Sequence, residues 1–282
     1  MKLVEPKDIK RYTLGTWQFG GDMTRNPQSD DETDIQAIKM HIDSGVNQIF
    51  TAQNYAEGWA EKLVGQAVKD YDRNKLLLST AIRKEHSAYD DMLHSIEESL
   101  NRMRLDYIDI VVHHAPIPEV AISESVKALN AIVDKGLARG FAVSNYNSKS
   151  MQEALNTTNH PILFNQVYYN LFVREVEEDG VLNLCQENSI LIQAFRPLEL
   201  GEFENEKSDL LVELANKYSL TNSQLALAWL TSQEGVVVVA TTHKKEHLLQ
   251  NLDAVNIQLE VDDTEKLRQK FPRKTLDKKW IR

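Results

Sequence analysis

The chain has 282 residues, of which 42% are apolar and 26% charged, a composition typical of a globular protein. This length suits one (β/α)8 barrel of about 250 residues, and it allows a large core without disulfides or metals. The net charge of −10 argues against nucleic acid and anionic membranes as partners. Cys185 is the only cysteine. It excludes an intrachain disulfide, and its apolar helical neighbours predict a buried small side chain.

The chain carries no recognisable targeting or membrane segment. Residues 1–10 are charged and lack the apolar stretch of a signal peptide. The longest aliphatic run, residues 236–240, is too short to cross a bilayer. We therefore expect a cytoplasmic protein that acts on a small molecule, as a monomer or weak dimer.

Short β-rich runs alternate with amphipathic segments along the whole chain. Helical periodicity is clear where Met92, Ile96, Leu100 and Met103 recur at spacings of four, four and three. Longer loops are expected at residues 168–176 and 196–206, and an extra helix at 225–230. The predicted strands are residues 12–17, 46–51, 75–80, 107–113, 140–144, 162–167, 190–194 and 236–240.

Eight such strands with helical crossovers predict a closed parallel sheet, a (β/α)8 TIM barrel forming a single domain over residues 1–282. In barrels of this kind the chemistry lies at the carboxyl ends of the strands. The C-terminal residues 273–282 either close over that mouth or extend away from it.

Several common site motifs are absent. The chain has no G-x-G-x-x-G after a strand, no G-x-x-x-x-G-K-[ST] and no G-x-S-x-G. His243 and His247 have the spacing of one helix face, but their H-K-K-E-H pattern lacks a third ligand, so we expect no metal. Adjacent His113 and His114 should point to opposite faces of a strand and cannot serve one site.

The strand ends carry an ordered set of short motifs. They are L-G-T-W at 14–17, G-V-N-Q-I-F-T-A-Q-N-Y at 45–55, Y-I-D-I-V-V-H-H-A-P at 107–116, G-F-A-V-S-N-Y at 140–146, N-Q-V-Y-Y-N at 165–170, A-F-R-P-L at 194–198 and T-T-H-K-K-E-H-L-L-Q-N at 241–251. Together, over about residues 12–260, this set resembles the aldo-keto reductases.

The resemblance implies a nicotinamide cofactor across the barrel mouth. Ser144, Asn145 and Gln166 would bind its carboxamide, which has two donors and an acceptor, and Phe195 would stack on its ring. Each polar residue taken alone would be read as a strand-end cap. NADP(H) is favoured over NAD(H), although His247 stands where arginine is common. The full set implied to contact the cofactor is Thr16, Trp17, Ser144, Asn145, Gln166, Phe195, Arg196, Pro197, Leu198, Thr241, Thr242, His247 and Asn251.

Two of the family's four catalytic side chains are replaced. The resemblance implies an Asp-Tyr-Lys-His tetrad, in which the lysine, held by the aspartate, lowers the pKa of the tyrosine. Here Tyr55 and His114 remain, while Phe50 and Ala81 occupy the Asp and Lys positions. Removing one member of a buried ion pair costs roughly 3–5 kcal/mol, whereas replacing both by apolar groups can be near neutral. The site is therefore coherently remodelled.

Arg83 or His86, folded back over the mouth, is an open alternative to the missing lysine. Arg83, two residues beyond Ala81, would share its face of a continued strand. The favoured reading of residues 83–86 is a solvated loop. Trp17, Trp59, Phe172 and Ala115 are candidates to shape the substrate pocket.

Three functions stay open at this point. The first is an NAD(P)(H)-dependent oxidoreductase acting on a carbonyl or alcohol with an altered proton relay. The second is a catalytically weak or inactive cofactor-binding sensor. The third is a lyase, dehydratase or isomerase that uses Tyr55 and His114, since barrels host many chemistries.

Overall fold

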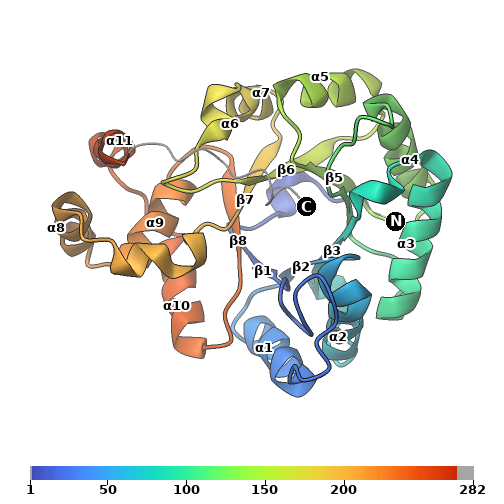
Figure 1. Ribbon diagram of the computed structural model, residues 1–282, viewed down its shortest axis with the longest axis horizontal. Helices are drawn as coiled ribbons and strands as arrows, with labels where there is room; N and C mark the ends of the chain where they lie inside the picture. Colours follow the sequence, from blue (N-terminus) through green and yellow to red (C-terminus); the bar gives the residue numbers. More distant parts are fainter. Residues whose placement is uncertain (1, 272–282) are drawn as a thin grey trace.

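A computed structural model describes residues 2–271 and shows a closed barrel of eight parallel strands (Figure 1). Each strand pairs with its neighbours in the sequence, and β1 also pairs with β8. The strands are β1 (Tyr12–Gly15), β2 (Gln48–Ala52), β3 (Leu77–Ile82), β4 (Ile110–His113), β5 (Phe141–Ser144), β6 (Ile162–Tyr168), β7 (Leu191–Phe195) and β8 (Val236–Ala240).

All eight predicted strands are present, and the boundaries of β8 match the prediction. The others differ by one to three residues at one or both ends. The largest corrections have local causes: Lys75 belongs to the 3-10 turn η3 (Arg73–Lys75), which Asp72 caps through the N–H of Asn74. Ile108, which we expected inside the fourth strand, makes only an isolated bridge to Ala138.

Helices surround the barrel, and α8 and α11 lie farthest from it at the left of Figure 1. The predicted extra helix before β8 is confirmed as α9. The helices are α1 (Asp31–Asp43), α2 (Trp59–Val68), α3 (Tyr89–Met103), α4 (Ile122–Asp134), α5 (Ser148–Thr157), α6 (Glu175–Glu178), α7 (Val181–Glu187), α8 (Asp209–Tyr218), α9 (Asn222–Thr231), α10 (Lys245–Ala254) and α11 (Val261–Lys270). Further 3-10 turns are η1 (Pro6–Asp8), η2 (Tyr55–Gly58), η4 (Lys84–His86) and η5 (Glu199–Asn205).

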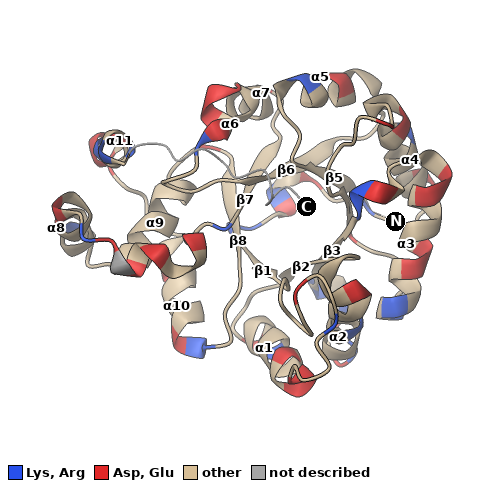
Figure 2. Ribbon diagram, viewed as in Figure 1, with Lys and Arg blue, Asp and Glu red and all other residues tan. Residues whose placement is uncertain are grey.

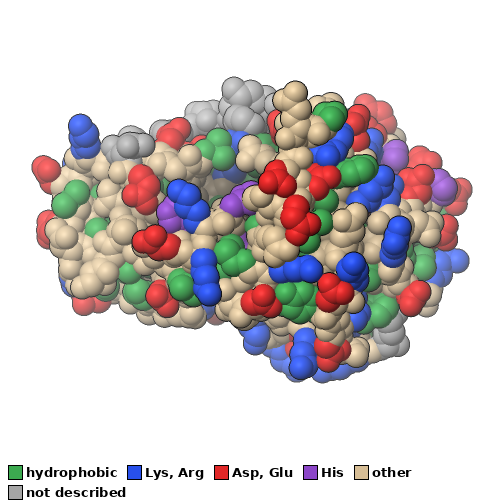
Figure 3. Space-filling view, turned by 90° about the horizontal axis from the view of Figure 1, so that it is seen from below, with side chains coloured by type: hydrophobic (Ala, Val, Ile, Leu, Met, Phe, Trp, Pro, Cys, Tyr) green, Lys and Arg blue, Asp and Glu red, His purple; other side chains and the backbone are tan. Residues whose placement is uncertain are grey.

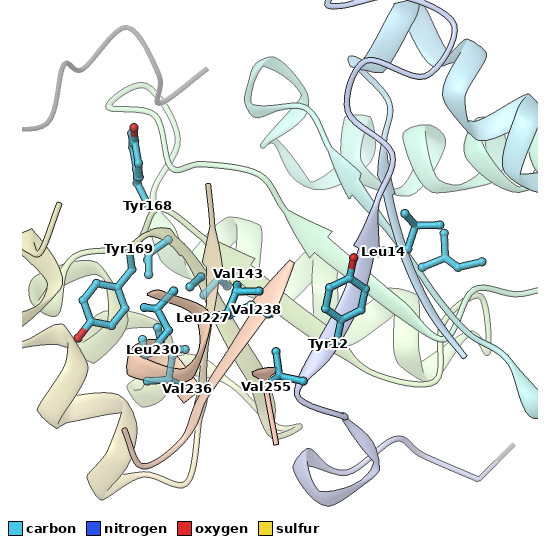
Figure 4. Packing of buried hydrophobic residues seen from close by; sticks show 14 of the residues in the cluster. Tyr12, Leu14, Val143, Tyr168, Tyr169, Leu227, Leu230, Val236, Val238 and Val255 are labelled. Carbon is cyan, nitrogen blue, oxygen red and sulfur yellow. The ribbon is translucent and has the colours of Figure 1, made fainter. Parts of the chain in front are cut away.

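The alternation of strand side chains builds two separate cores. On β8, Val236 and Val238 belong to the large layer between barrel and helices, whereas Val237 and Val239 belong to a smaller cluster inside the barrel. Figure 4 shows part of the outer layer, where Tyr169 lies beside Leu230. The inner cluster forms the floor beneath the barrel mouth.

Charged residues lie almost entirely on the outer helices and loops (Figure 2). On the face shown in Figure 3, acidic and basic side chains are interspersed, without a wide field of one sign. Within residues 2–271 we find no helix with the length and apolar character needed to cross a membrane. Cys185 is fully buried, as predicted.

Candidate active site

A cavity of about 410 Å³ opens at the carboxyl ends of the strands. It draws its wall from the ends of seven strands and from the loops that follow them. The lining residues are Gly15, Trp17, Gln18, Met23, Phe50, Asn54, Tyr55, His114, Asn145, Gln166, Phe195, Arg196, Pro197, Leu198, Leu200, Gly201, Val239, Ala240, Thr241, Thr242 and His243.

Eleven of the fifteen residues singled out from the sequence line this cavity. They are Trp17, Tyr55, His114, Asn145, Gln166, Phe195, Arg196, Pro197, Leu198, Thr241 and Thr242. The four others, Thr16, Ser144, His247 and Asn251, lie outside the lining. Thr16 is buried and donates to the carbonyl of Phe50, whereas Asn251 on α10 hydrogen-bonds the Tyr12 hydroxyl. His247, on the same helix, is exposed.

Tyr55 rests on an apolar floor. Phe50 and Ala81 belong to the inner cluster, and the Phe50 ring meets the Tyr55 ring edge-on with centroids 6.2 Å apart. Among the described residues the Tyr55 hydroxyl has no hydrogen-bond partner and no adjacent cation. Burial raises its pKa above the ordinary value of about 10. The hydroxyl therefore stays protonated and is a weak acid.

The His114 ring also meets the Tyr55 ring edge-on, with ring centroids 6.2 Å apart. Burial lowers its pKa to about 4, and Lys84 adds to this lowering while Glu85 opposes it. The ring is therefore neutral at pH 7. Its Nδ1 is buried without a partner among the described residues, which favours a proton on Nε2. Such a ring can donate a hydrogen bond into the cavity.

Two side-chain amides face the cavity from β5 and β6. The Asn145 amide nitrogen donates to the His114 carbonyl (3.0 Å) and to Ser144 Oγ (3.0 Å), which leaves its Oδ1 as an acceptor. Ser144 donates in turn to the Gln166 carbonyl at 2.9 Å. Gln166 Nε2 donates to Gln193 Oε1 at 2.7 Å. Ser144 and Gln193 thus orient the amides of the two lining residues.

The cavity lining contains a cation, Arg196. The Arg196 guanidinium lies over the Trp17 ring at 5.1 Å and near the Tyr168 ring at 5.7 Å. Tyr168 and Asn170 both hydrogen-bond the Glu199 carboxylate. Arg196 is thereby held between the β1 and β6 ends, where it can meet an anionic group.

The interpretation of His243 and His247 as one helix face is wrong. Helix α10 begins at Lys245, so His243 precedes it and lines the cavity instead. Its Nε2 lies 2.8 Å from Asp34 Oδ1, and its ring packs on Phe19. No cluster that could hold a metal occurs within residues 2–271. The backbone turn after β8, which periodicity cannot predict, is responsible for the difference.

Other lining residues were missed because they sit on irregular loops. Gln18 and Met23 follow β1, Asn54 precedes Tyr55, and Leu200 and Gly201 belong to η5. No periodic pattern marks such positions. Their only signal was closeness in sequence to the strand-end motifs or, for Asn54, a position within one of them.

Four candidates for shaping the pocket or relaying protons do not line it. Trp59 lies between Arg25 and Lys62, and Phe172 stacks on Phe203. Ala115 is buried. Arg83 contacts the Gln53 carbonyl at 3.4 Å and does not reach the lining.

His113 faces away from the cavity, as predicted, and forms a buried network. Its Nδ1 lies 2.8 Å from the Tyr146 hydroxyl and its Nε2 2.7 Å from Ser87 Oγ. Because Ser87 donates to the Lys84 carbonyl, the proton of His113 is on Nε2. Burial, with a contribution from His114, lowers the pKa of His113 to about 3. This network ties the β3–α3 loop to the end of β5.

Backbone strain concentrates at the mouth. Of the ten described non-glycine residues with positive φ, three follow helix ends: Arg104, Ser189 and Ser219. Six others line the cavity or adjoin a lining residue: Gln18, Ala56, Asn145, Arg196, Glu199 and Leu200. The last, Glu57, follows Ala56 in the same turn. Each such residue costs on the order of 1–3 kcal/mol, a cost that proteins tolerate chiefly at functional sites.

The comparison with known families agrees with this geometry. The Aldo/keto reductase family matches residues 11–271. The chain belongs to the aldo/keto reductase family. The resemblance of the strand-end motifs and the barrel prediction are both confirmed.

Relatives and solved structures are similar over nearly the whole chain. Methylglyoxal reductase YeaE of Escherichia coli (strain K12) is 29% identical over 262 residues, covering 92% of this chain and 89% of the relative. The thermostable aldo-keto reductase Tm1743, solved with epalrestat, has a TM-score of 0.87 and 34% identity, over 93% of this chain and 95% of that one. An aldo-keto reductase from Klebsiella pneumoniae in complex with NADPH has a TM-score of 0.84 and 30% identity, over 95% and 93%.

Proposed function

We propose that this member of the family is a nicotinamide-dependent oxidoreductase that acts on a small carbonyl or alcohol and prefers NADP(H). The observation that carries the proposal is one cavity lined by Asn145, Gln166, Phe195 and Arg196, with Tyr55 and His114 beside them. Amides suit a carboxamide, an aromatic ring suits a flat heterocycle, and a guanidinium suits a phosphate. The similar Klebsiella enzyme was solved with NADPH. The bound nicotinamide would supply or accept a hydride.

The chain's own residues would bind and polarise the carbonyl. The Tyr55 hydroxyl and the neutral His114 ring can both donate a hydrogen bond to the substrate oxygen. Proton transfer from Tyr55 is less favourable, because burial raises its pKa and no lysine counters this effect. We therefore infer slow turnover at neutral pH.

Small aldehydes are the first substrates to test. Relatives at about 29% identity include methylglyoxal reductases YeaE and DkgB of Escherichia coli. Arg196 lines the same cavity as Tyr55 and His114. This arrangement suits a compact, polar carbonyl compound.

The raised pKa of Tyr55 favours a second candidate, a protein that binds the nucleotide and does not turn it over. Such a protein would sense the cofactor. It keeps the same binding residues and differs only in proton delivery.

The test measures NADPH and NADH consumption with methylglyoxal and related aldehydes, in the native chain and in Tyr55→Phe. We expect slow oxidation of NADPH that Tyr55→Phe abolishes. Cofactor binding without oxidation would favour the sensor. Equal turnover in Tyr55→Phe would contradict the assigned role of the tyrosine.

A further inference from the structure

The backbone directly after Tyr55 is strained. Ala56 (φ 47°, ψ 42°), Glu57 (φ 57°, ψ 35°) and Gly58 (φ 84°) are consecutive left-handed residues in η2. Only the glycine adopts this conformation readily. A turn with two strained non-glycine residues unwinds unless the surrounding structure holds it.

The β1–α1 loop holds this turn. The N–H of Ala56 donates to the Asp22 carbonyl at 2.7 Å, and the N–H of Glu57 donates to the Met23 carbonyl at 3.2 Å. In return the N–H of Arg25 donates to the Glu57 carboxylate at 3.2 Å. Three hydrogen bonds thus join two segments about thirty residues apart in sequence, on either side of helix α1.

The same loop residues also build the cavity wall. The Met23 side chain lines the cavity. The Asp22 carboxylate accepts a hydrogen bond at 2.7 Å from the indole of Trp17, which lines it too. Asp22 and Met23 therefore contact the wall with their side chains and the Tyr55 turn with their carbonyls.

The loop itself is fastened on its outer side. The Arg25 guanidinium donates to the Gly20 carbonyl at 2.6 Å and pairs with Asp31 at 2.9 Å. It also stacks over Trp59 at 4.6 Å. Because of these contacts the loop resists independent movement and can impose its geometry on the turn.

We propose that the β1–α1 loop positions the Tyr55 hydroxyl by clamping the left-handed turn, with Glu57 as a positioning residue. The cavity wall at Trp17 and Met23 and the tyrosine would then move as one unit. The effect of this clamp on catalysis rests on the proposed function. Its effect on the position of the Tyr55 hydroxyl does not.

The first experiment needs no ligand. The chain, which has nine tyrosines, is labelled with fluorotyrosine, and the Tyr55 fluorine resonance is assigned by its loss in Tyr55→Phe. Glu57→Ala removes the hydrogen bond that the Glu57 carboxylate accepts from the Arg25 N–H. Alanine at this position still has the energetic cost of the left-handed backbone conformation. Glu57→Gln keeps an acceptor oxygen and is the matched control. We expect the Tyr55 resonance to shift and broaden in Glu57→Ala alone.

Glu57→Gly separates the effect of backbone strain from the effect of losing the side chain. It also lacks the hydrogen bond to the Arg25 N–H, but glycine adopts the left-handed conformation without strain. We expect its Tyr55 resonance to lie nearer to that of the native chain than the resonance of Glu57→Ala does. A Tyr55 resonance unchanged in Glu57→Ala would overturn the proposal.

Turnover gives a second readout. We expect kcat to fall about tenfold in Glu57→Ala with KM and nucleotide affinity unchanged, because misplacing a reacting group slows chemistry more than binding. The kcat of Glu57→Gln should be close to that of the native chain. Equal kcat in Glu57→Ala and the native chain would overturn the positioning role. Absence of turnover in the native chain would count against the proposed function and leave the resonance test valid.

Discussion

Phe50 and Ala81 set what Tyr55 can do. Both side chains are almost completely buried in the inner cluster, and neither position supplies a charge or hydrogen bond to the tyrosine. The Tyr55 ring contacts the ring of Phe50 and the neutral ring of His114 edge-on. A buried phenol in such surroundings donates hydrogen bonds well and gives up its proton reluctantly.

A polar pair introduced at positions 50 and 81 should make Tyr55 a stronger acid. In the double variant Phe50→Asp with Ala81→Lys, the new cation would favour the ionised phenol and lower the pKa of Tyr55. We expect kcat/KM for methylglyoxal to rise at least about tenfold, because positioned general acids contribute roughly 10²–10⁴-fold. The alkaline limb of the pH–rate profile should move to lower pH.

The single variant Ala81→Lys is the control for this experiment. Ala81→Lys alone buries an unpaired cation, so it should lose roughly 3–5 kcal/mol of stability. No gain from the double variant would mean that proton delivery does not pass through Tyr55.

The buried histidines make stability depend on pH. The folded pKa values are about 3 for His113 and about 4 for His114, below the unfolded value near 6.5. The unfolded chain therefore binds more protons, and stability present above pH 6.5 is lost as pH falls. Each histidine should contribute roughly 1.4 kcal/mol per pH unit within this window.

Urea unfolding between pH 7 and pH 5 measures this dependence. His113→Gln should reduce the slope of the unfolding free energy against pH by roughly 1.4 kcal/mol per pH unit, which corresponds to the uptake of about one proton fewer on unfolding. His94→Gln is the matched control, because His94 is exposed on α3. An identical slope in His113→Gln and the native chain would show that His113 titrates normally.

The elements divide the barrel into a stabilising end and a functional end. At the amino end of β4 the buried Asp109 carboxylate accepts from the Leu78 N–H (2.8 Å). It also pairs with Arg139 (2.7 Å) and Arg73 (2.7 Å). These contacts join β3 and β4 to the segment before β5, far from the cavity. The carboxyl ends instead carry the strained loops.

Asp109→Ala should therefore affect stability and spare binding. We expect a loss of about 3 kcal/mol in the free energy of unfolding, since one partner of a buried pair is removed. Nucleotide affinity should be unchanged at temperatures where the variant is folded. Asp106→Ala, at an exposed neighbouring position, is the control, and an equal effect from both variants would contradict this division.

The sequence was sufficient to predict the barrel architecture and many of the residues that line the cavity. The β-rich runs located all eight strands, and the order of the motifs pointed to the residues at strand ends that line the cavity, such as Gln166 and Phe195. It could not locate Met23, Leu200 or the contact between His243 and Asp34, because these depend on loop paths between distant segments. The left-handed turn after Tyr55 also gave no signal, since neither Ala56 nor Glu57 favours that conformation.

At the scale of the whole molecule, the barrel has the fold of the aldo/keto reductase family, and we infer that Phe50 and Ala81 stand in place of two of that family's four catalytic side chains. The polar and cationic lining around Asn145, Gln166 and Arg196 has a clear use if a nicotinamide nucleotide binds there. The apolar side chains of Phe50 and Ala81 should affect proton delivery by Tyr55 and leave nucleotide binding intact. Cofactor affinity is therefore the property on which the account depends.

The most direct test is a fluorescence titration of the purified chain with NADPH and with NADH. We predict that NADPH binds with a Kd in the micromolar range or below and more tightly than NADH, and that Arg196→Met weakens this binding. Absence of binding by either nucleotide at millimolar concentration would contradict both the oxidoreductase and the sensor.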